Sequence, residues 1–164
     1  MQYKQKAQKT LTGARLRSYA YALLTRREYS KAELTNKLLE YAQDDQEAID
    51  FIQQLHEYGY QSDQRAAEQV LRSHLYKGQG PHRIKQKLQQ RSLDTCYIDE
   101  QIQETDWFTE AYNLKIKKFG DNVEKDPKKR AKQIRFLQYR GYDLDIIFKV
   151  VDFSEDYYNW RQSY

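Results

Sequence analysis

Few residues of this chain have the types and spacing that catalysis or metal binding requires. The three histidines, His56, His74 and His82, belong to no zinc-binding pattern with a carboxylate. Cys96 follows Thr95 at an expected helix start, where a thiolate is favoured, but no base partner is identifiable. As the single cysteine it allows no intrachain disulfide. We expect solvated or capping histidines, a cysteine with a structural or incidental role, and no metal.

The segment Gly78-Gln79-Gly80 is the one candidate for a phosphate-binding loop. It lacks the Gly-Lys-Ser/Thr ending of such loops and the strand that precedes them, so a turn that starts a helix at Pro81 explains it better. Carboxylates are abundant, but none can be paired within an apolar cleft. The sequence therefore predicts no catalytic residue, no cofactor and no enzyme. An enzyme would need a buried group with a shifted pKa in a concave pocket.

Charge alternates along the chain. Residues 72–91 contain bases and no acid, whereas residues 92–110 contain acids and no Lys or Arg. An earlier change runs from the basic residues 1–31 to the acidic residues 40–63. One interpretation is that neighbouring helices of opposite sign pair at the solvated surface. The other is a basic face suited to DNA phosphates or acidic protein surfaces, and the two are compatible.

An internal repeat must position these charges. Segments 30–42, 80–92 and 129–141 align without gaps and begin about fifty residues apart. Each carries apolar anchors at helical spacing and ends in a small residue. The anchors are Leu34 and Leu38, Ile84 and Leu88, and Ile134 and Leu137. With helical sequence on both sides of each segment, the unit is three short helices, repeated three times.

Start and stop signals agree with this repeat. Ser30 and Glu33 form a capping box, and Gly80-Pro81 places proline at the first helical position. Asp126 is a plausible N-cap before Pro127, and Gly59 a left-handed cap before Asp63 opens the next unit.

Composition favours an all-α fold, an elongated array of three tandem three-helix repeats. Apolar residues make up 39% and charged residues 32% of 164, which suits thin stacked modules better than one thick core. Only 6 Gly and 2 Pro are present, few for a fold built from tight turns. The expected parts are a basic N-terminal segment (1–14), repeats at 15–60, 61–105 and 106–153, and a C-terminal tail (154–164).

Apolar runs are too short for a membrane span or a secretory segment, so we expect a cytoplasmic protein. The net charge of +4 alone does not make it a nucleic-acid binder. Most tyrosines near helix ends should pack between helices, although some could stack on bases or line a partner's groove. These are Tyr19, Tyr21, Tyr58, Tyr60, Tyr76, Tyr139 and Tyr142.

The ordered motifs resemble the RecX family of bacterial regulators of the RecA recombinase, over roughly residues 15–152. They include Leu23-Leu24-Thr25-Arg26-Arg27-Glu28-Tyr29-Ser30, then Gly78-Gln79-Gly80-Pro81, then Phe136-Leu137-Gln138-Tyr139-Arg140-Gly141-Tyr142. The chain departs from the family pattern at Gln61-Ser62, at Ala66 where an aromatic is common, and at Ser92 where glycine is frequent. These departures predict altered packing between the helices of the first two repeats.

The resemblance implies a protein that binds in the groove of the RecA–single-stranded DNA filament and restrains ATP hydrolysis, strand exchange and co-protease action. We expect a monomer, with single- or double-stranded DNA as a further partner. A DNA-binding protein that acts without RecA is the alternative. From charge placement, the expected contact residues are Arg26, Arg27, Lys31, Lys37, Arg72, Lys77, Arg83, Lys85, Lys87, Lys117, Lys118, Lys128, Lys129, Arg130 and Lys132.

Overall fold

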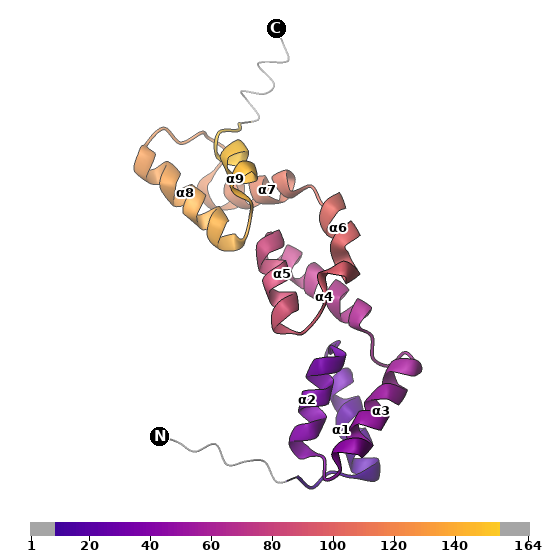
Figure 1. The fold of residues 1–164 in the computed structure, drawn as a ribbon. Coiled ribbons are helices and arrows are strands. Elements are labelled where there is room, and N and C mark those ends of the chain that lie inside the picture. The colour runs from indigo at the N-terminus through magenta and orange to yellow at the C-terminus, as the bar shows by residue number, and fades with distance from the viewer. Residues whose placement is uncertain (1–8, 155–164) are drawn as a thin grey trace, which may run out of the picture. The chain divides into compact units, whose positions relative to one another are not determined.

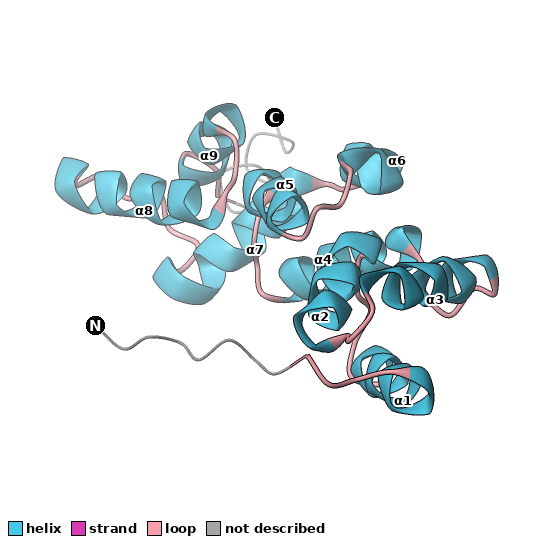
Figure 2. Ribbon diagram, turned by 60° about the horizontal axis from the view of Figure 1, so that its bottom comes forward, coloured by secondary structure: helices cyan, strands magenta, loops and turns pink. Residues whose placement is uncertain are grey.

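The computed structural model describes residues 9–154, and within this range the chain is helical with connecting loops and no strand (Figures 1 and 2). The helices fall into three groups of three, as the repeat predicts. The groups are α1 (Gly13–Leu24), α2 (Lys31–Tyr41) and α3 (Asp45–Glu57); α4 (Asp63–Tyr76), α5 (Pro81–Gln90) and α6 (Asp99–Glu104), with the short 3₁₀ helix η1 (Thr95–Ile98) before α6; and α7 (Trp107–Phe119), α8 (Pro127–Arg140) and α9 (Leu144–Val151). The all-α prediction is confirmed.

Two compact units divide the chain, and each is described by itself. Unit 1 comprises the residues up to Gln69 together with Leu88–Tyr97, and unit 2 comprises Val70–Lys87 and the residues from Ile98 onward. The first half of α4 and the end of α5, both from repeat 2, therefore lie in the same compact unit as repeat 1. The loop between α4 and α5 belongs with repeat 3. The predicted domain limits remain a prediction, and residues 1–8 and 155–164 of the two terminal segments lie outside the described residues.

The helix starts follow the signals in the sequence. The Ser30 hydroxyl accepts a hydrogen bond from the Glu33 backbone N–H at 3.0 Å, and the Glu33 carboxylate accepts one from the Ser30 N–H at 3.0 Å. Asp126 caps α8 by accepting from the Lys128 N–H at 2.7 Å. Pro81 is the first residue of α5, where its missing N–H leaves no intrahelical bond unmade. All three predicted starts are confirmed.

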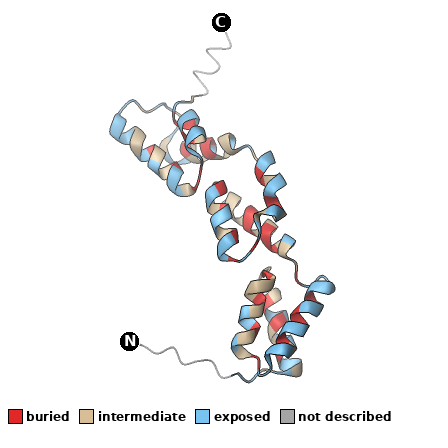
Figure 3. Cartoon of the chain, in the orientation of Figure 1, coloured by how far each residue is buried: buried red, intermediate tan, exposed pale blue. Residues whose placement is uncertain are grey.

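Five of the six apolar anchors of the repeat are buried, and Figure 3 shows buried positions along the helices. Leu34 and Leu38 lie in the core of unit 1 with residues from α1 and α3. Leu137 lies in the core of unit 2 with residues from α7 and α9, and Ile134 packs against the same core half-buried. Burial of these side chains is the main force that holds each three-helix group together. None of the described helices combines the length and apolar character needed to cross a membrane.

Helix ends differ between repeats at one aligned position. Gly141 ends α8 with φ +94°, and the aligned Ser92 follows α5 with φ +53°, the one non-glycine residue with positive φ in the described chain. After both residues the next N–H returns to a carbonyl one turn back, from Leu93 to Leu88 and from Tyr142 to Leu137. Ser92 thus adopts a left-handed conformation that glycine reaches without a Cβ clash.

Replacing Ser92 with glycine is expected to stabilise unit 1 by about 0.5–1 kcal/mol, because the left-handed strain outweighs the extra chain entropy of glycine. Urea denaturation followed by far-UV circular dichroism measures the change. Ser73→Gly, inside α4, is the matched control and should destabilise instead. A loss of stability in Ser92→Gly would contradict this account.

Candidate functional site

Two acid-free basic segments meet in unit 2. Residues 70–87 and 127–142 contain no Asp or Glu. They come together where the loop between α4 and α5 contacts the end of α8. The Gly80 N–H donates to the Arg140 carbonyl at 2.8 Å, and the His82 N–H donates to the Gly141 carbonyl at 3.0 Å. We call the surface formed by residues 72–87 and 127–142 the basic junction.

Close backbone approach at the basic junction requires its two glycines. A Cβ on Gly80 would lie 2.5 Å from the Gly141 carbonyl oxygen and 2.7 Å from the Tyr142 nitrogen. A Cβ on Gly141 would lie 2.7 Å from the Arg83 backbone nitrogen. The Tyr142 hydroxyl adds a bond to the Gly78 carbonyl at 3.2 Å, and burial raises the pKa of Tyr142 to about 12. The segment Gly78-Gln79-Gly80 is therefore a turn that packs repeat 2 against repeat 3.

Arginines and aromatic rings alternate on the exposed side of this junction. Arg83 donates from Nε to the Tyr139 carbonyl at 2.8 Å, and its guanidinium carbon lies 4.6 Å from the Tyr139 ring centroid. Arg140 donates to the Lys77 carbonyl at 2.8 Å and lies 5.3 Å from the Phe136 ring. Such contacts orient the cations and rings without neutralising the charge. Asp143, the acid that directly follows the second segment, is hydrogen-bonded to His82.

The remaining predicted bases of unit 2 differ in whether their charge is paired with an acid within the fold. Lys118 lies 3.9 Å from the Phe136 ring centroid and so extends the junction onto α7. Arg130 donates to both oxygens of Asp152, at 3.0 and 2.9 Å, which satisfies its charge internally. The other predicted bases are exposed except Lys87, which is half-buried. They are Arg72, Lys77, Lys85, Lys117, Lys128, Lys129 and Lys132.

The four predicted contact bases of unit 1 differ in their exposure and in their partners within the fold. Arg26 and Lys37 are exposed, and Lys37 lies 3.9 Å from Glu40. Lys31 donates to the Gln53 side chain at 2.6 Å. Arg27 donates to Glu33 and lies 3.6 Å from the Tyr29 ring centroid, so its charge is used within the fold.

Glu33 is the centre of a partly buried ion network in unit 1. Besides closing the capping box, it accepts from Arg27 at 3.0 Å and from Arg91 Nη2 at 2.9 Å, and Arg91 also donates to the Glu28 carbonyl at 2.6 Å. Burial opposes ionisation of Glu33, but the bonds from Arg91 and Arg27 outweigh it and lower its pKa from 4.5 to about 2. Repeat 2 is thus bound to repeat 1 through Arg91. Nothing in the sequence pattern indicated this role for Arg91.

Two of the departures from the family pattern in repeat 2 have clear structural roles. Gln61 is buried, its Oε1 accepts a hydrogen bond from His56 Nδ1 at 3.0 Å, and its Nε2 donates to the Tyr29 carbonyl at 3.1 Å. Ala66 is fully buried. The packing between the first two repeats therefore depends on an amide network at Gln61.

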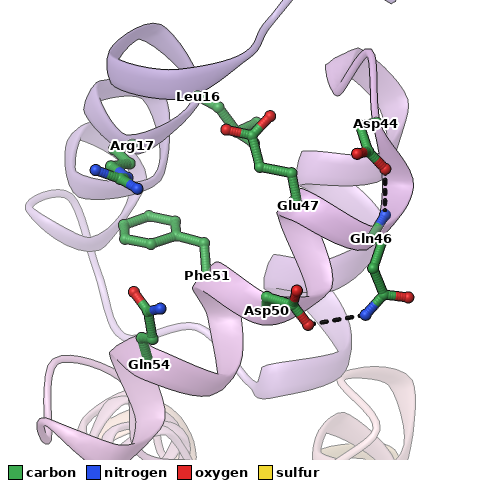
Figure 4. A pocket seen from close by; sticks show the side chains of 8 residues that line it. All are labelled: Leu16, Arg17, Asp44, Gln46, Glu47, Asp50, Phe51 and Gln54. Carbon is green, nitrogen blue, oxygen red and sulfur yellow. Dashed lines mark hydrogen bonds between the residues drawn. The ribbon is translucent and has the colours of Figure 1, made fainter.

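A surface pocket of 310 Å³ lies in unit 1 between α1 and α3 (Figure 4). Its carboxylates already serve the fold. Glu47 accepts from the Gly13 N–H and the Thr12 hydroxyl, each at 2.7 Å, which caps α1. Asp44 accepts from the Gln46 N–H and Asp50 from the Gln46 amide, both at 2.8 Å, as the dashed lines show. The pocket therefore reflects helix capping and assembles no catalytic pair.

The other groups capable of chemistry are likewise part of the fold. No cluster of three metal-ligating side chains occurs among residues 9–154. Lys115 is buried and its pKa is lowered by burial, but its ammonium donates to the carbonyls of Asp121 and Asn122 at 2.7 and 3.0 Å and so holds the loop after α7. His56 and His74 bond to glutamine side chains, and Cys96 is exposed.

Charge placement in the sequence did not select two bases of the junction, Arg135 and Arg140, and the sequence left open whether Tyr76 and Tyr139 pack between helices or face a partner. Tyr76 and Tyr139 are 95% and 72% exposed, whereas Tyr142 is buried. The acid-free run 127–142 was the available signal for Arg135 and Arg140. No local pattern distinguishes the exposed tyrosines from the buried one.

Comparison with known proteins identifies close relatives. A family model for the second three-helix domain of RecX matches residues 62–100, and one for its third three-helix domain matches residues 104–151. The chain is 57% identical over 146 residues to the regulatory protein RecX of Acinetobacter baylyi, covering 89% of this chain and 92% of that protein. It is 37% identical over 139 residues to that of Vibrio campbellii, covering 84% and 90%. The crystal structure of RecX from Lactobacillus salivarius shares the fold, with a TM-score of 0.69 at 20% identity over 83% of this chain and 92% of that one.

Proposed function

The chain belongs to the RecX family of regulatory proteins, which are not enzymes, and from this premise we propose that it regulates RecA by binding in the groove of the RecA–single-stranded DNA filament. Binding there would restrain RecA's ATP hydrolysis, strand exchange and co-protease action. A cytoplasmic monomer is the form we propose for this role.

The basic junction is the observation that supports a nucleoprotein partner best. Two segments distant in sequence, each free of acids, present exposed bases from one compact unit. DNA phosphates and acidic protein surfaces both attract such a surface, and both occur in a nucleoprotein filament. Among the predicted contacts, Lys77, Lys85 and the lysines of α8 (Lys128, Lys129 and Lys132) are therefore preferred over Arg27 and Arg130, whose charges are satisfied internally.

Inhibition of RecA tests the proposal directly. The protein is titrated into RecA filaments on single-stranded DNA while ATP hydrolysis is followed. We expect substoichiometric inhibition, and we expect the double variant Lys77→Glu/Lys85→Glu to need about tenfold more protein, because both lysines are exposed on the basic junction. Arg83 is left unchanged because it packs against Gly141 and Tyr139.

Lys125→Glu/Lys149→Glu is the matched control, because it makes the same change in net charge at exposed lysines of unit 2 outside the junction. It should inhibit like the unmodified chain. No inhibition by the unmodified chain would overturn the proposed function. Equal inhibition by the two double variants would contradict the assignment of the basic junction as the surface that contacts the filament. Binding to bare DNA without any effect on RecA would favour a DNA-binding protein that acts independently.

A further inference from the structure

Tyr139 is an exposed aromatic side chain held in place by a cation. It lies in the last turn of α8 with 72% of its surface exposed, and the Arg83 guanidinium carbon is 4.6 Å from its ring centroid. Arg83 is itself fixed by bonds to the Tyr139 carbonyl at 2.8 Å and the Gln86 side chain at 3.1 Å. Because the guanidinium covers one side of the ring and most of the residue is exposed, the other side is open to a ligand.

The surroundings of this ring are positively charged. Arg140 follows Tyr139 in the chain and bonds to the Lys77 carbonyl at 2.8 Å. That bond ties the end of α8 to the end of α4, where Tyr76 is 95% exposed. Exposed rings beside several bases, without a carboxylate in either segment, are the combination that single-stranded nucleic-acid grooves use.

We propose that Tyr139 stacks on an unpaired base of single-stranded DNA, with Arg83, Arg140 and Lys77 beside the neighbouring phosphates and Tyr76 as a second platform. The choice of DNA rests on the proposed function. Single strands are favoured over duplex because only an unpaired base offers a free face to a tyrosine ring. An acidic protein surface would engage the bases of the junction but would not need the open ring.

Stacking and phosphate attraction can be separated with two oligonucleotides. A labelled oligothymidine of about 16 nucleotides carries bases and phosphates, whereas an abasic strand of equal length carries phosphates alone. By fluorescence anisotropy, Tyr139→Ala should weaken oligothymidine binding about tenfold and leave abasic binding unchanged. Tyr139→Phe keeps the ring and should bind oligothymidine like the unmodified chain.

Tyr58→Ala is the matched control, because Tyr58 is 78% exposed but lies in unit 1, directly after Glu57 at the C-terminal end of α3 and outside the basic junction. It should leave binding to both oligonucleotides unchanged. Thermal melting by circular dichroism verifies that each variant is folded, as expected for substitutions at exposed positions. Unchanged oligothymidine binding by Tyr139→Ala, or an equal loss with the abasic strand, would overturn the stacking proposal.

The outcome is independent of the RecA assay. If the unmodified chain inhibits RecA while Tyr139→Ala binds oligothymidine normally, only the stacking site is wrong. If binding to oligothymidine depends on Tyr139 but RecA is unaffected, the stacking site stands and the proposed function is wrong.

Discussion

Replacing Glu33 with glutamine is expected to lower the free energy of unfolding of unit 1 by about 3 kcal/mol at neutral pH. The side chains of Glu33 and Arg91 are 21% and 10% exposed, so the substitution leaves a largely buried guanidinium without its carboxylate. Arg27 loses the same partner. Urea denaturation followed by far-UV circular dichroism measures the total loss. Amide hydrogen exchange at Leu34 and Leu38 reports the same change locally, because both residues lie in the core of unit 1.

The pH dependence of this loss follows from the lowered pKa of Glu33. A carboxylate whose pKa falls from 4.5 to about 2 on folding stabilises the native state above pH 4.5. That stabilisation disappears as the pH falls through this interval, so the difference between the unmodified chain and Glu33→Gln should shrink between about pH 5 and pH 2. Asp152→Asn is the control, because Arg130 binds Asp152 equally well by geometry but Asp152 is 54% exposed. It should cost less than about 1 kcal/mol, and an equal cost for both substitutions would contradict the role of burial.

Replacing Gly80 with alanine is expected to destabilise unit 2 by about 3 kcal/mol. The added Cβ would lie within 2.7 Å of three backbone atoms of Gly141 and Tyr142, and backbone atoms cannot rotate away as a side chain does. Relief of the overlap requires the loop and the end of α8 to separate, which would break the bond between the Gly80 N–H and the Arg140 carbonyl. Trp107 lies 6.4 Å from the Tyr142 ring, so its fluorescence in a Trp160→Phe background follows unfolding of the junction.

Gly120→Ala separates steric overlap from backbone strain. Gly120 has φ +84° and ψ 176°, a backbone conformation that is essentially restricted to glycine, and no atom lies within 4 Å of an added Cβ, so its substitution costs only backbone strain, about 1–3 kcal/mol. Gly80 has no positive φ, so its substitution costs only the overlap. A loss below about 1 kcal/mol for Gly80→Ala would show that the two segments do not meet as closely as the structure indicates.

The sequence by itself determined the helices and their grouping. The capping box at Ser30, the proline at position 81 and the aspartate at position 126 act within a few residues, so their effects can be inferred from spacing alone. Apolar anchors at helical spacing determined which sides of α2 and α5 are buried, because burial of a helix face depends on period and not on the partner. The position of Ser92 also followed from alignment of the repeats, although its left-handed backbone did not.

Tertiary structure decided which charges are available and which tyrosines are exposed. Arg91 and Arg83 belong to the same acid-free run, yet Arg91 is buried against Glu33 while Arg83 lies on the basic junction beside Tyr139. Tyr139 and Tyr142 are three residues apart, but one is exposed and the other buried. These differences depend on contacts between residues more than fifty positions apart, such as Gly80 with Arg140. Local periodicity carries no information about such contacts, because they are fixed by how one repeat packs on the next.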